Sequence, residues 1–226
     1  MKKLHLEQID KNEVLRYLGY RPGVHTPDQE TEELIGRASA AVLAAATVRA
    51  VSARFPLLGE NGLAEPGDLL AGKDIFAHLR GCHDAVLMAL TLGDGVDQAL
   101  RAAQAQSTLY QTVMDCCASV AVEQACDLYE AELRHQCETG GEYLTGRFSP
   151  GYGDFPIEKQ QVMQRLLDTR RRIGLGVTES SILIPRKSVT ALLGISDRPV
   201  TGKLAGCGNC ALREKCSYRK EGTTCV

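Results

Sequence analysis

The segment from residue 147 to residue 188 reads RFSPGYGDFPIEKQQVMQRLLDTRRRIGLGVTESSILIPRKS, and it opens on a rigid corner. Pro150 fixes its own φ angle and biases Ser149 toward an extended backbone, while Gly151 permits a bend or the close approach of a ligand. Arg147 and Tyr152 flank this corner. The pattern predicts a rigid loop over residues 147–152 that presents a guanidinium and a phenol.

A helix is expected after this loop, because Pro156 suits the first turn of a helix. Gly174 is expected to end the helix, and an apolar run to Ile184 and a corner at Pro185 follow. The apolar face of the helix is expected at Met163, Leu166, Leu167 and Ile173.

The order of these motifs resembles the activation domain of cobalamin-dependent methionine synthase. The resemblance is carried by R-x-x-P-G-Y at 147–152, T-E-S at 178–180 and P-x-x-S-V at 185–189. It continues more weakly upstream, through T-L-G at 91–93 and A-V-E at 121–123, and reaches about Asp197. The resemblance implies that the Arg-to-Tyr segment binds S-adenosylmethionine.

The resemblance also implies roles for single residues. Arg147 can take the ligand carboxylate with two hydrogen bonds. Ser149, Gly151 and Tyr152 are expected at the adenine and ribose end, and Glu123 is expected to balance the ammonium or sulfonium charge. Glu179 is expected near the ligand or a corrinoid partner.

Structural interpretations stand beside these roles. The 147–152 segment can be only a braced turn. Glu123 and Asp115 lie in a predicted helix, from about Thr112 to His135, that is apolar on much of its circumference; an acid there is either a gap in the covering or a ligand group. For Asp115 the structural interpretation is preferred. Glu179 and Ser188 can equally brace the sheet through hydrogen bonds.

Two departures from the family pattern concern the ligand. The strand after the Ser-Val corner is aromatic-rich in the family, but here it reads Ala-Leu-Leu-Gly at 191–194. The family also places an acid near the ligand on an N-terminal helix, and Ala38 to Val48 contains none. Weaker binding, or a different arrangement of charges, is expected.

Composition limits the class of protein. The chain has 226 residues, 44% of them hydrophobic, and a net charge of -2. That length suffices for a sizeable core, and the near-neutral charge gives no electrostatic case for nucleic acid or a membrane. The N-terminus has no secretory signal pattern, and the run from Ala38 to Val48 is too short to span a bilayer. A cytoplasmic protein is expected.

The order of predicted elements indicates an α+β fold, with N-terminal helices packed on a twisted antiparallel sheet. A short helix is expected to begin at Ile9 or Asp10, and a long one to run from Thr26-Pro27 to just before Phe55. Further elements are a helix at 74–80, a strand at 85–92, helices from 94 to 135 with a break near Ser107, and short strands from 142 onward. Without a G-x-G-x-x-G motif, a Rossmann-type methyltransferase is disfavoured. The expected division is an activation-like domain at 1–200 and a Cys-rich tail at 201–226.

The tail concentrates cysteines, as C-x2-C-x5-C-x8-C. Four thiolates match the ligand count of either Zn or an iron-sulfur cluster, and metal binding can fold a polar segment. A 4Fe-4S cluster is preferred by analogy with the electron that the implied reaction consumes; an unmetallated or redox-active tail is the alternative. The expected ligands are Cys207, Cys210, Cys216 and Cys225.

The implied function is reactivation of a cobalamin-dependent methyltransferase such as methionine synthase. As a separate subunit, the chain is expected to use S-adenosylmethionine for reductive methylation of cob(II)alamin held by a partner, with flavodoxin or ferredoxin as the electron donor. No side chain has to act as a nucleophile or base. Two alternatives remain: a non-catalytic corrinoid-protein chaperone, and an iron-sulfur electron-transfer partner.

Overall fold

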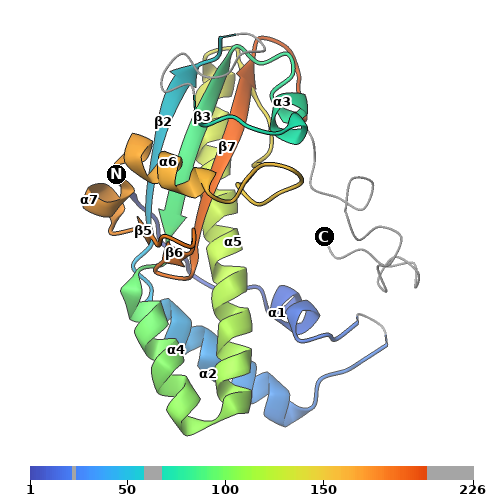
Figure 1. Ribbon diagram of the computed structural model, residues 1–226. Coiled ribbons are helices and arrows are strands. Elements are labelled where there is room, and N and C mark those ends of the chain that lie inside the picture. Colours follow the sequence, from blue (N-terminus) through green and yellow to red (C-terminus); the bar gives the residue numbers. More distant parts are fainter. Residues whose placement is uncertain (22–23, 59–67, 203–226) are drawn as a thin grey trace. The chain divides into compact units, whose positions relative to one another are not determined.

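The fold is an α+β arrangement of helices and a curled antiparallel sheet, seen in a computed structural model that describes residues 1–21, 24–58 and 68–202 (Figure 1). The helices are α1 (Lys11–Tyr17), α2 (Gln29–Ala45), α3 (Lys73–His78), α4 (Asp94–Gln106), α5 (Thr108–Thr139), α6 (Lys159–Leu167) and α7 (Thr169–Ile173). The strands are β1 (Lys2–Lys3), β2 (Arg49–Pro56), β3 (Asp84–Thr91), β4 (Tyr143–Leu144), β5 (Gly176–Val177), β6 (Leu183–Ile184) and β7 (Ser188–Ser196). The α+β class predicted from the order of elements is confirmed.

The main sheet has the strand order β1-β2-β3-β7-β4, and a separate small sheet pairs β5 with β6. The arrows of β2, β3 and β7 alternate in direction (Figure 1). The central strands of the main sheet are almost fully buried: every residue of β3 after Asp84 is buried, as are the last seven residues of β7. A strand that is buried along its whole length is expected to be covered on both faces.

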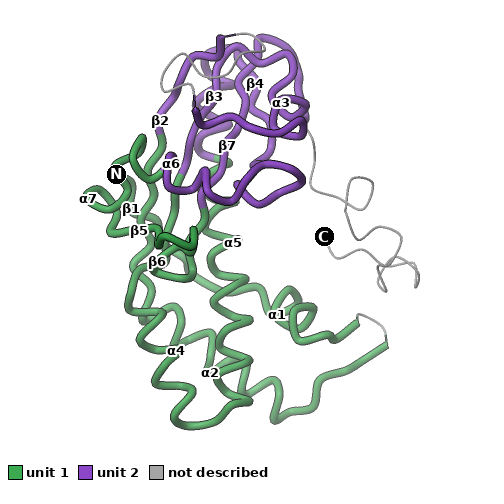
Figure 2. The backbone as a smooth tube through the Cα atoms, viewed as in Figure 1, with its two compact units in different colours: residues 1–52, 89–131, 164–189 green, residues 53–88, 132–163, 190–226 purple. Residues whose placement is uncertain are grey.

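The chain divides into two compact units, each built from three separate segments (Figure 2). Unit 1 comprises residues 1–52, 89–131 and 164–189, and unit 2 comprises 53–88, 132–163 and 190–226. Strands β2, β3 and β7 and helix α5 each contribute residues to both units. The boundary expected at residue 200 stays a prediction, because residues 203–226 lie outside the described part.

Local sequence signals place the helix ends in unit 1. Asp10 caps α1 by accepting hydrogen bonds from the backbone N–H groups of Asn12 and Glu13, as a short acidic side chain does at an N-cap. Asp28 caps α2 in the same way, with an oxygen 2.8 Å from the N–H of Thr31. The helix therefore begins just after the Thr26-Pro27 pair predicted to start it.

One predicted element was wrong. The long N-terminal helix was expected to run to just before Phe55, but α2 ends at Ala45 and residues 49–56 form strand β2. In this strand Ala50 and Val51 are fully buried. The alanine-rich run favours helix locally, but the sheet offers β2 a place to bury its apolar residues, and tertiary packing overrides propensity.

The helix predicted after Pro156 is divided in two. Helix α6 ends at Leu167, and Asp168 adopts a left-handed backbone with φ of 48° before α7 begins. Gly174 ends α7 with φ of 73°, as predicted, because glycine takes this conformation without a steric penalty.

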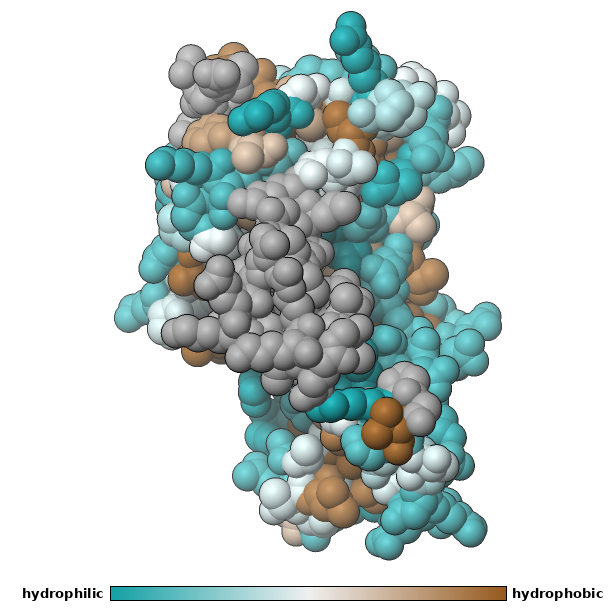
Figure 3. All heavy atoms as spheres, turned by 90° about the vertical axis from the view of Figure 1, so that its right-hand side faces the viewer, coloured by the Kyte–Doolittle hydropathy of each residue, from teal (hydrophilic) through white to brown (hydrophobic). Residues whose placement is uncertain are grey.

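The described surface on the face drawn in Figure 3 is mostly hydrophilic, with hydrophobic residues scattered through it. Scattered exposed apolar residues are normal for a protein surface. Among the residues that the structure describes, no helix combines the length and apolarity needed to cross a bilayer.

Candidate functional site

The segment that leads into the 147–152 loop is held against strand β7 within unit 2. Leu144 pairs with Ile195, and the N–H groups of Thr145 and Phe148 donate to the carbonyl oxygens of Gly194 and Leu192, each at 2.9 Å. Leu192 returns a hydrogen bond to Phe148 at 2.8 Å. The chain therefore enters the loop as an extended edge of the sheet.

Thr145 adds a buried side-chain anchor just before the loop. Its hydroxyl lies 3.0 Å from Nε2 of His78 and accepts a hydrogen bond of 2.8 Å from the N–H of Gly194. Both Thr145 and His78 are almost fully buried. Arg134 also donates from its guanidinium to the carbonyl oxygens of Leu144 and Thr145. The backbone that leads into the loop is thus fixed by hydrogen bonds with Gly194 and Arg134.

The loop itself is closed by backbone hydrogen bonds. The N–H of Tyr152 donates to the carbonyl of Ser149 at 3.0 Å, and the N–H of Gly151 donates to the carbonyl of Phe155 at 2.8 Å. Gly151 has φ of +96°, which L-residues rarely adopt. A Cβ there would also lie 3.1 Å from Cδ1 of Ile157. The bend predicted at Gly151 therefore forms, in a conformation that favours glycine.

Ring contacts centred on Phe148 help to hold the loop in place. Phe148 is 4% exposed, and its ring lies 4.9 Å from His78 and 6.3 Å from Phe155 between centroids. Tyr152 meets the Phe148 ring edge-on at 5.8 Å and keeps 45% of its surface exposed. Such T-shaped contacts are favourable. Tyr152 is therefore oriented by the core but open to a ligand.

Asp154 connects the loop to helix α3. Gly72 occupies the N-cap of α3 and has no side chain to offer, so the cap comes from elsewhere in the sequence. The carboxylate of Asp154 accepts hydrogen bonds from the N–H groups of Lys73 and Asp74 at 2.7 and 2.9 Å. A Cβ at Gly72 would collide with the backbone of Asp154. The close approach thus requires glycine at this cap.

Four of the predicted ligand residues lie together in unit 2, on the 147–152 loop. Arg147 and Ser149 are half-buried, and Gly151 and Tyr152 are exposed. Glu123 and Glu179 belong to unit 1 instead. Their roles toward a ligand stay predictions.

The two acids of helix α5 differ in their surroundings within unit 1. Asp115 forms an ion pair of 2.9 Å with Lys187, whose side chain is only 11% exposed and also donates to Ser119. Asp115 therefore has a partner within the protein, as an acid on a largely covered helix requires. Glu123 lies on an exposed position of α5, as expected for a gap in the apolar covering.

The T-E-S turn and the Ser-Val corner are braced internally in unit 1. The Thr178 hydroxyl accepts a hydrogen bond of 2.9 Å from the N–H of Ile182, and Glu179 is exposed at the tip of this turn. The Ser188 hydroxyl donates to the carbonyl of Pro185 at 2.6 Å and lies within hydrogen-bond distance, 2.8 Å, of the Thr91 hydroxyl. Ser188 therefore has the structural role that the sequence left open.

The two segments that depart from the resembled family's pattern, at 191–194 and 38–48, contain residues buried in the core. Ala191, Leu192 and Leu193 have no exposed surface, so this part of β7 serves the core. Ala38 and Val42 of α2 are likewise fully buried.

The four cysteines predicted as metal ligands, Cys207, Cys210, Cys216 and Cys225, lie outside the described residues. Among the described cysteines, Cys117, Cys126 and Cys137 are buried, and Cys82 and Cys116 are half-buried.

Comparison with known proteins supports the architecture. No family model matches the chain, and no curated protein matches it at a significant level. Among solved structures, the MetH reactivation domain bound to AdoHcy is similar with a TM-score of 0.59 and 17% sequence identity. The alignment covers 99% of this chain and 86% of that one. The chain therefore has the fold of a MetH reactivation domain.

Proposed function

We propose that this chain binds S-adenosylmethionine and serves as the reactivation component of a cobalamin-dependent methyltransferase. The observation that carries the proposal is the 147–152 loop: an Arg-x-x-Pro-Gly-Tyr corner fixed by backbone hydrogen bonds, in a fold similar to a reactivation domain solved with AdoHcy. Fold alone does not define an activity. The loop supplies the chemical groups that the ligand requires.

The loop geometry restricts how it can hold the ligand. The N–H groups of Gly151 and Tyr152 are already bonded inside the loop. Contacts to the adenine and ribose are therefore expected from carbonyl oxygens, the Ser149 hydroxyl and the Tyr152 ring. Because a carbonyl oxygen has two lone pairs, it can accept from the amino group of adenine while it stays bonded within the loop. Arg147 is expected to hold the ligand carboxylate.

The chain's task in the reaction is to position the methyl donor. One electron reduces cob(II)alamin on the partner to cob(I)alamin, and cob(I)alamin displaces the methyl group from the sulfonium, leaving methylcobalamin and S-adenosylhomocysteine. The second step is downhill and removes the reduced species as it forms. Holding the sulfonium in line with cobalt needs no side-chain nucleophile, because the cofactors provide the chemistry.

The partner is expected to dock beside the loop in unit 2. Tyr152 and Ile157 are 45% and 39% exposed there, although both are large and apolar. These two side chains would be available to a partner that approaches the loop. The cysteine tail is proposed to bind an iron-sulfur cluster or Zn and to relay electrons from a flavodoxin or ferredoxin, or to dock that donor.

Methyl transfer in a reconstituted system tests the proposal. Cob(II)alamin on a cobalamin-dependent methyltransferase is incubated anaerobically with a low-potential reductant and methyl-labelled S-adenosylmethionine, with and without this chain. Label should enter methylcobalamin only when the chain is present. No labelled methylcobalamin in its presence, over a panel of such methyltransferases, would reject the reactivation function.

A corrinoid-protein chaperone is the second candidate, because the buried strand at 191–193 offers no side chain to a ligand. Under that function the chain would bind the cobalamin protein equally well with and without S-adenosylmethionine. Co-sedimentation of this chain with the cobalamin protein, with and without S-adenosylmethionine, separates the two functions. Reactivation predicts that S-adenosylmethionine is bound in the complex. An electron-transfer role is distinguished by iron-sulfur absorption without affinity for S-adenosylmethionine.

A further inference from the structure

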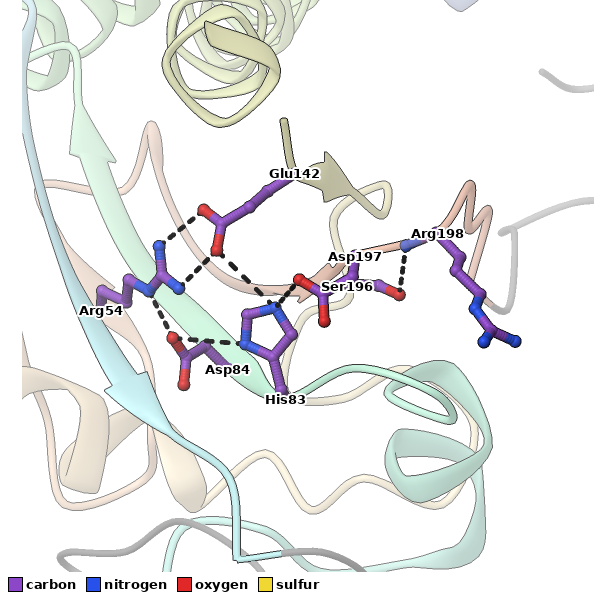
Figure 4. Close-up of polar contacts among 7 residues, drawn as sticks. All are labelled: Arg54, His83, Asp84, Glu142, Ser196, Asp197 and Arg198. Carbon is purple, nitrogen blue, oxygen red and sulfur yellow. Dashed lines mark hydrogen bonds and ion pairs between the residues drawn. The ribbon is translucent and has the colours of Figure 1, made fainter. Parts of the chain in front are cut away.

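A second group of convergent side chains lies at one end of the sheet in unit 2 (Figure 4). Antiparallel pairing brings the start of β3 and β4 and the end of β7 to this edge. His83 directly precedes β3, Glu142 directly precedes β4, and Asp197 directly follows β7. These three residues are far apart in the sequence, and the pairing of the strands brings them together.

The imidazole of His83 points its Nε2 at two carboxylates. This nitrogen lies 3.3 Å from Oδ1 of Asp197 and 3.7 Å from Oε1 of Glu142. It is shielded from solvent and makes no hydrogen bond. One nitrogen and two carboxylate oxygens, all within 4.8 Å of one another, thus surround a common point.

These separations suit a coordinated cation. Nitrogen and oxygen ligands bind first-row divalent metals at about 2.0–2.2 Å, so neighbouring ligand atoms lie about 2.8–3.6 Å apart in octahedral or tetrahedral geometry. The His83 and Asp197 atoms, at 3.3 Å, already have this spacing, and the Glu142 oxygen lies slightly farther from Nε2, at 3.7 Å. The Nε2 lone pair, which accepts no hydrogen bond in the protein, would be donated to the metal ion.

The other side of the imidazole is arranged as in many metal sites. Nδ1 of His83 faces Oδ2 of Asp84 at 3.5 Å, and a carboxylate in this position selects the tautomer that leaves Nε2 free to coordinate. Arg54 holds Asp84 through its Nε at 2.5 Å. The same guanidinium donates to both oxygens of Glu142 at 2.8 Å.

Charge favours a cation here. Three carboxylates and one guanidinium leave the group with two excess negative charges when the imidazole is neutral. Oε1 of Glu142 accepts one hydrogen bond from Arg54, and its second lone pair remains available to a metal. The guanidinium of Arg198 points away from the cluster and adds no positive charge at its centre (Figure 4).

We propose that His83, Glu142 and Asp197 form a binding site for a divalent first-row metal ion, with Asp84 and Arg54 as its supporting groups. One imidazole and two carboxylates suit Mn²⁺, Fe²⁺ or Zn²⁺. This site is separate in sequence from the cysteine tail, and it does not depend on the proposed reactivation function.

Manganese binding tests the site, because Mn²⁺ prefers oxygen and imidazole ligands and competes poorly for the cysteine thiolates. Metal-free protein comprising residues 1–226 is titrated with Mn²⁺, and the concentration of unbound ion is measured by electron paramagnetic resonance. One saturable site is expected. Asp197→Asn should weaken it at least tenfold, and His83→Ala should remove saturable binding. Glu138→Gln, which removes an exposed acid of α5, should leave the affinity unchanged.

Asp197→Asn is the decisive variant, because its side chain is 84% exposed and its loss should not unfold the protein. Circular dichroism and thermal unfolding check that each variant is folded, and Mn²⁺ should raise the Tm of the parent protein more than that of Asp197→Asn. Absence of saturable binding by the parent protein at millimolar Mn²⁺, or equal affinity in Asp197→Asn and Glu138→Gln, would show that the cluster is an ion-pair network only.

Discussion

The 147–152 loop and the His83 cluster, formed by His83, Glu142, Asp197, Asp84 and Arg54, lie in the same compact unit, but they are built in opposite ways. The loop is closed by backbone hydrogen bonds between near neighbours, such as Tyr152 to Ser149. The cluster depends on side-chain contacts between distant positions: Arg54 meets Asp84 thirty residues away and Glu142 eighty-eight residues away. A site made from backbone corners leaves a signature in local sequence, and a site made from strand ends does not.

The largest expected effect comes from removing the aromatic support of the loop. Phe148→Ala should lower the free energy of unfolding by about 3–5 kcal/mol, because Phe148 is almost fully buried and a cavity would remain. Urea denaturation followed by circular dichroism measures the change. Tyr143→Ala, which removes a 41% exposed ring from β4, is the matched control. A loss below about 1 kcal/mol for Phe148→Ala would show that the loop does not depend on this ring.

This contrast explains what the sequence could and could not predict. Pro150, Gly151 and Gly174 impose backbone constraints that act locally, so the corner and the end of α7 were predicted at the right residues. Strand β2 was not predicted because the alanine-rich sequence from Ala38 to Val48 favours helix. The chain becomes extended at residue 49 because it pairs with the rest of the sheet there, and that pairing leaves no local signal in the sequence. The His83 cluster carries no local pattern, since its members lie in or next to four strands, β2, β3, β4 and β7, and meet only when these strands pair.

Arg147→Ala should have the next largest effect, on ligand binding and not on folding. Loss of a charged group that holds a carboxylate costs about 3 kcal/mol, which corresponds to roughly 100-fold weaker binding of S-adenosylmethionine. Calorimetric titration of folded protein measures this. Arg165→Ala removes an exposed guanidinium from α6 and should bind as the parent does. Equal affinities of the two variants would place the ligand carboxylate elsewhere.

A smaller effect is expected from the link between the loop and α3. Asp154→Ala removes the acceptor of two backbone N–H groups and should cost about 1–2 kcal/mol in the free energy of unfolding. Asp154→Asn keeps one acceptor oxygen and should recover part of the loss. Chemical denaturation of the three proteins provides the values. A fully stable Asp154→Ala would mean that α3 does not need this cap.

The smallest effect concerns pH and the ion pairs of the His83 cluster. Hydrogen bonds from Arg54 lower the pKa of Glu142 from its ordinary value of 4.5. The folded state therefore releases this proton more readily than the unfolded state, so the contribution to stability is present above about pH 4.5 and is lost as the pH falls through the lowered pKa. Arg54→Met should make stability less dependent on pH in this acid range.

Denaturation from about pH 7 down to about pH 3 compares Arg54→Met with Arg101→Met, which removes an exposed guanidinium from α4. The control should keep the acid dependence of the parent protein. Parallel curves for all three proteins would show that the Arg54 to Glu142 pair adds nothing to acid stability, as is common for exposed ion pairs.

The most direct test of the central claim is a calorimetric titration of the anaerobically purified chain with S-adenosylmethionine, after its iron and zinc have been assayed. The proposed function predicts saturable binding of one ligand per chain, competed by S-adenosylhomocysteine. Absence of saturable binding by the folded protein would contradict it, and the likeness to the reactivation domain would then be one of fold alone.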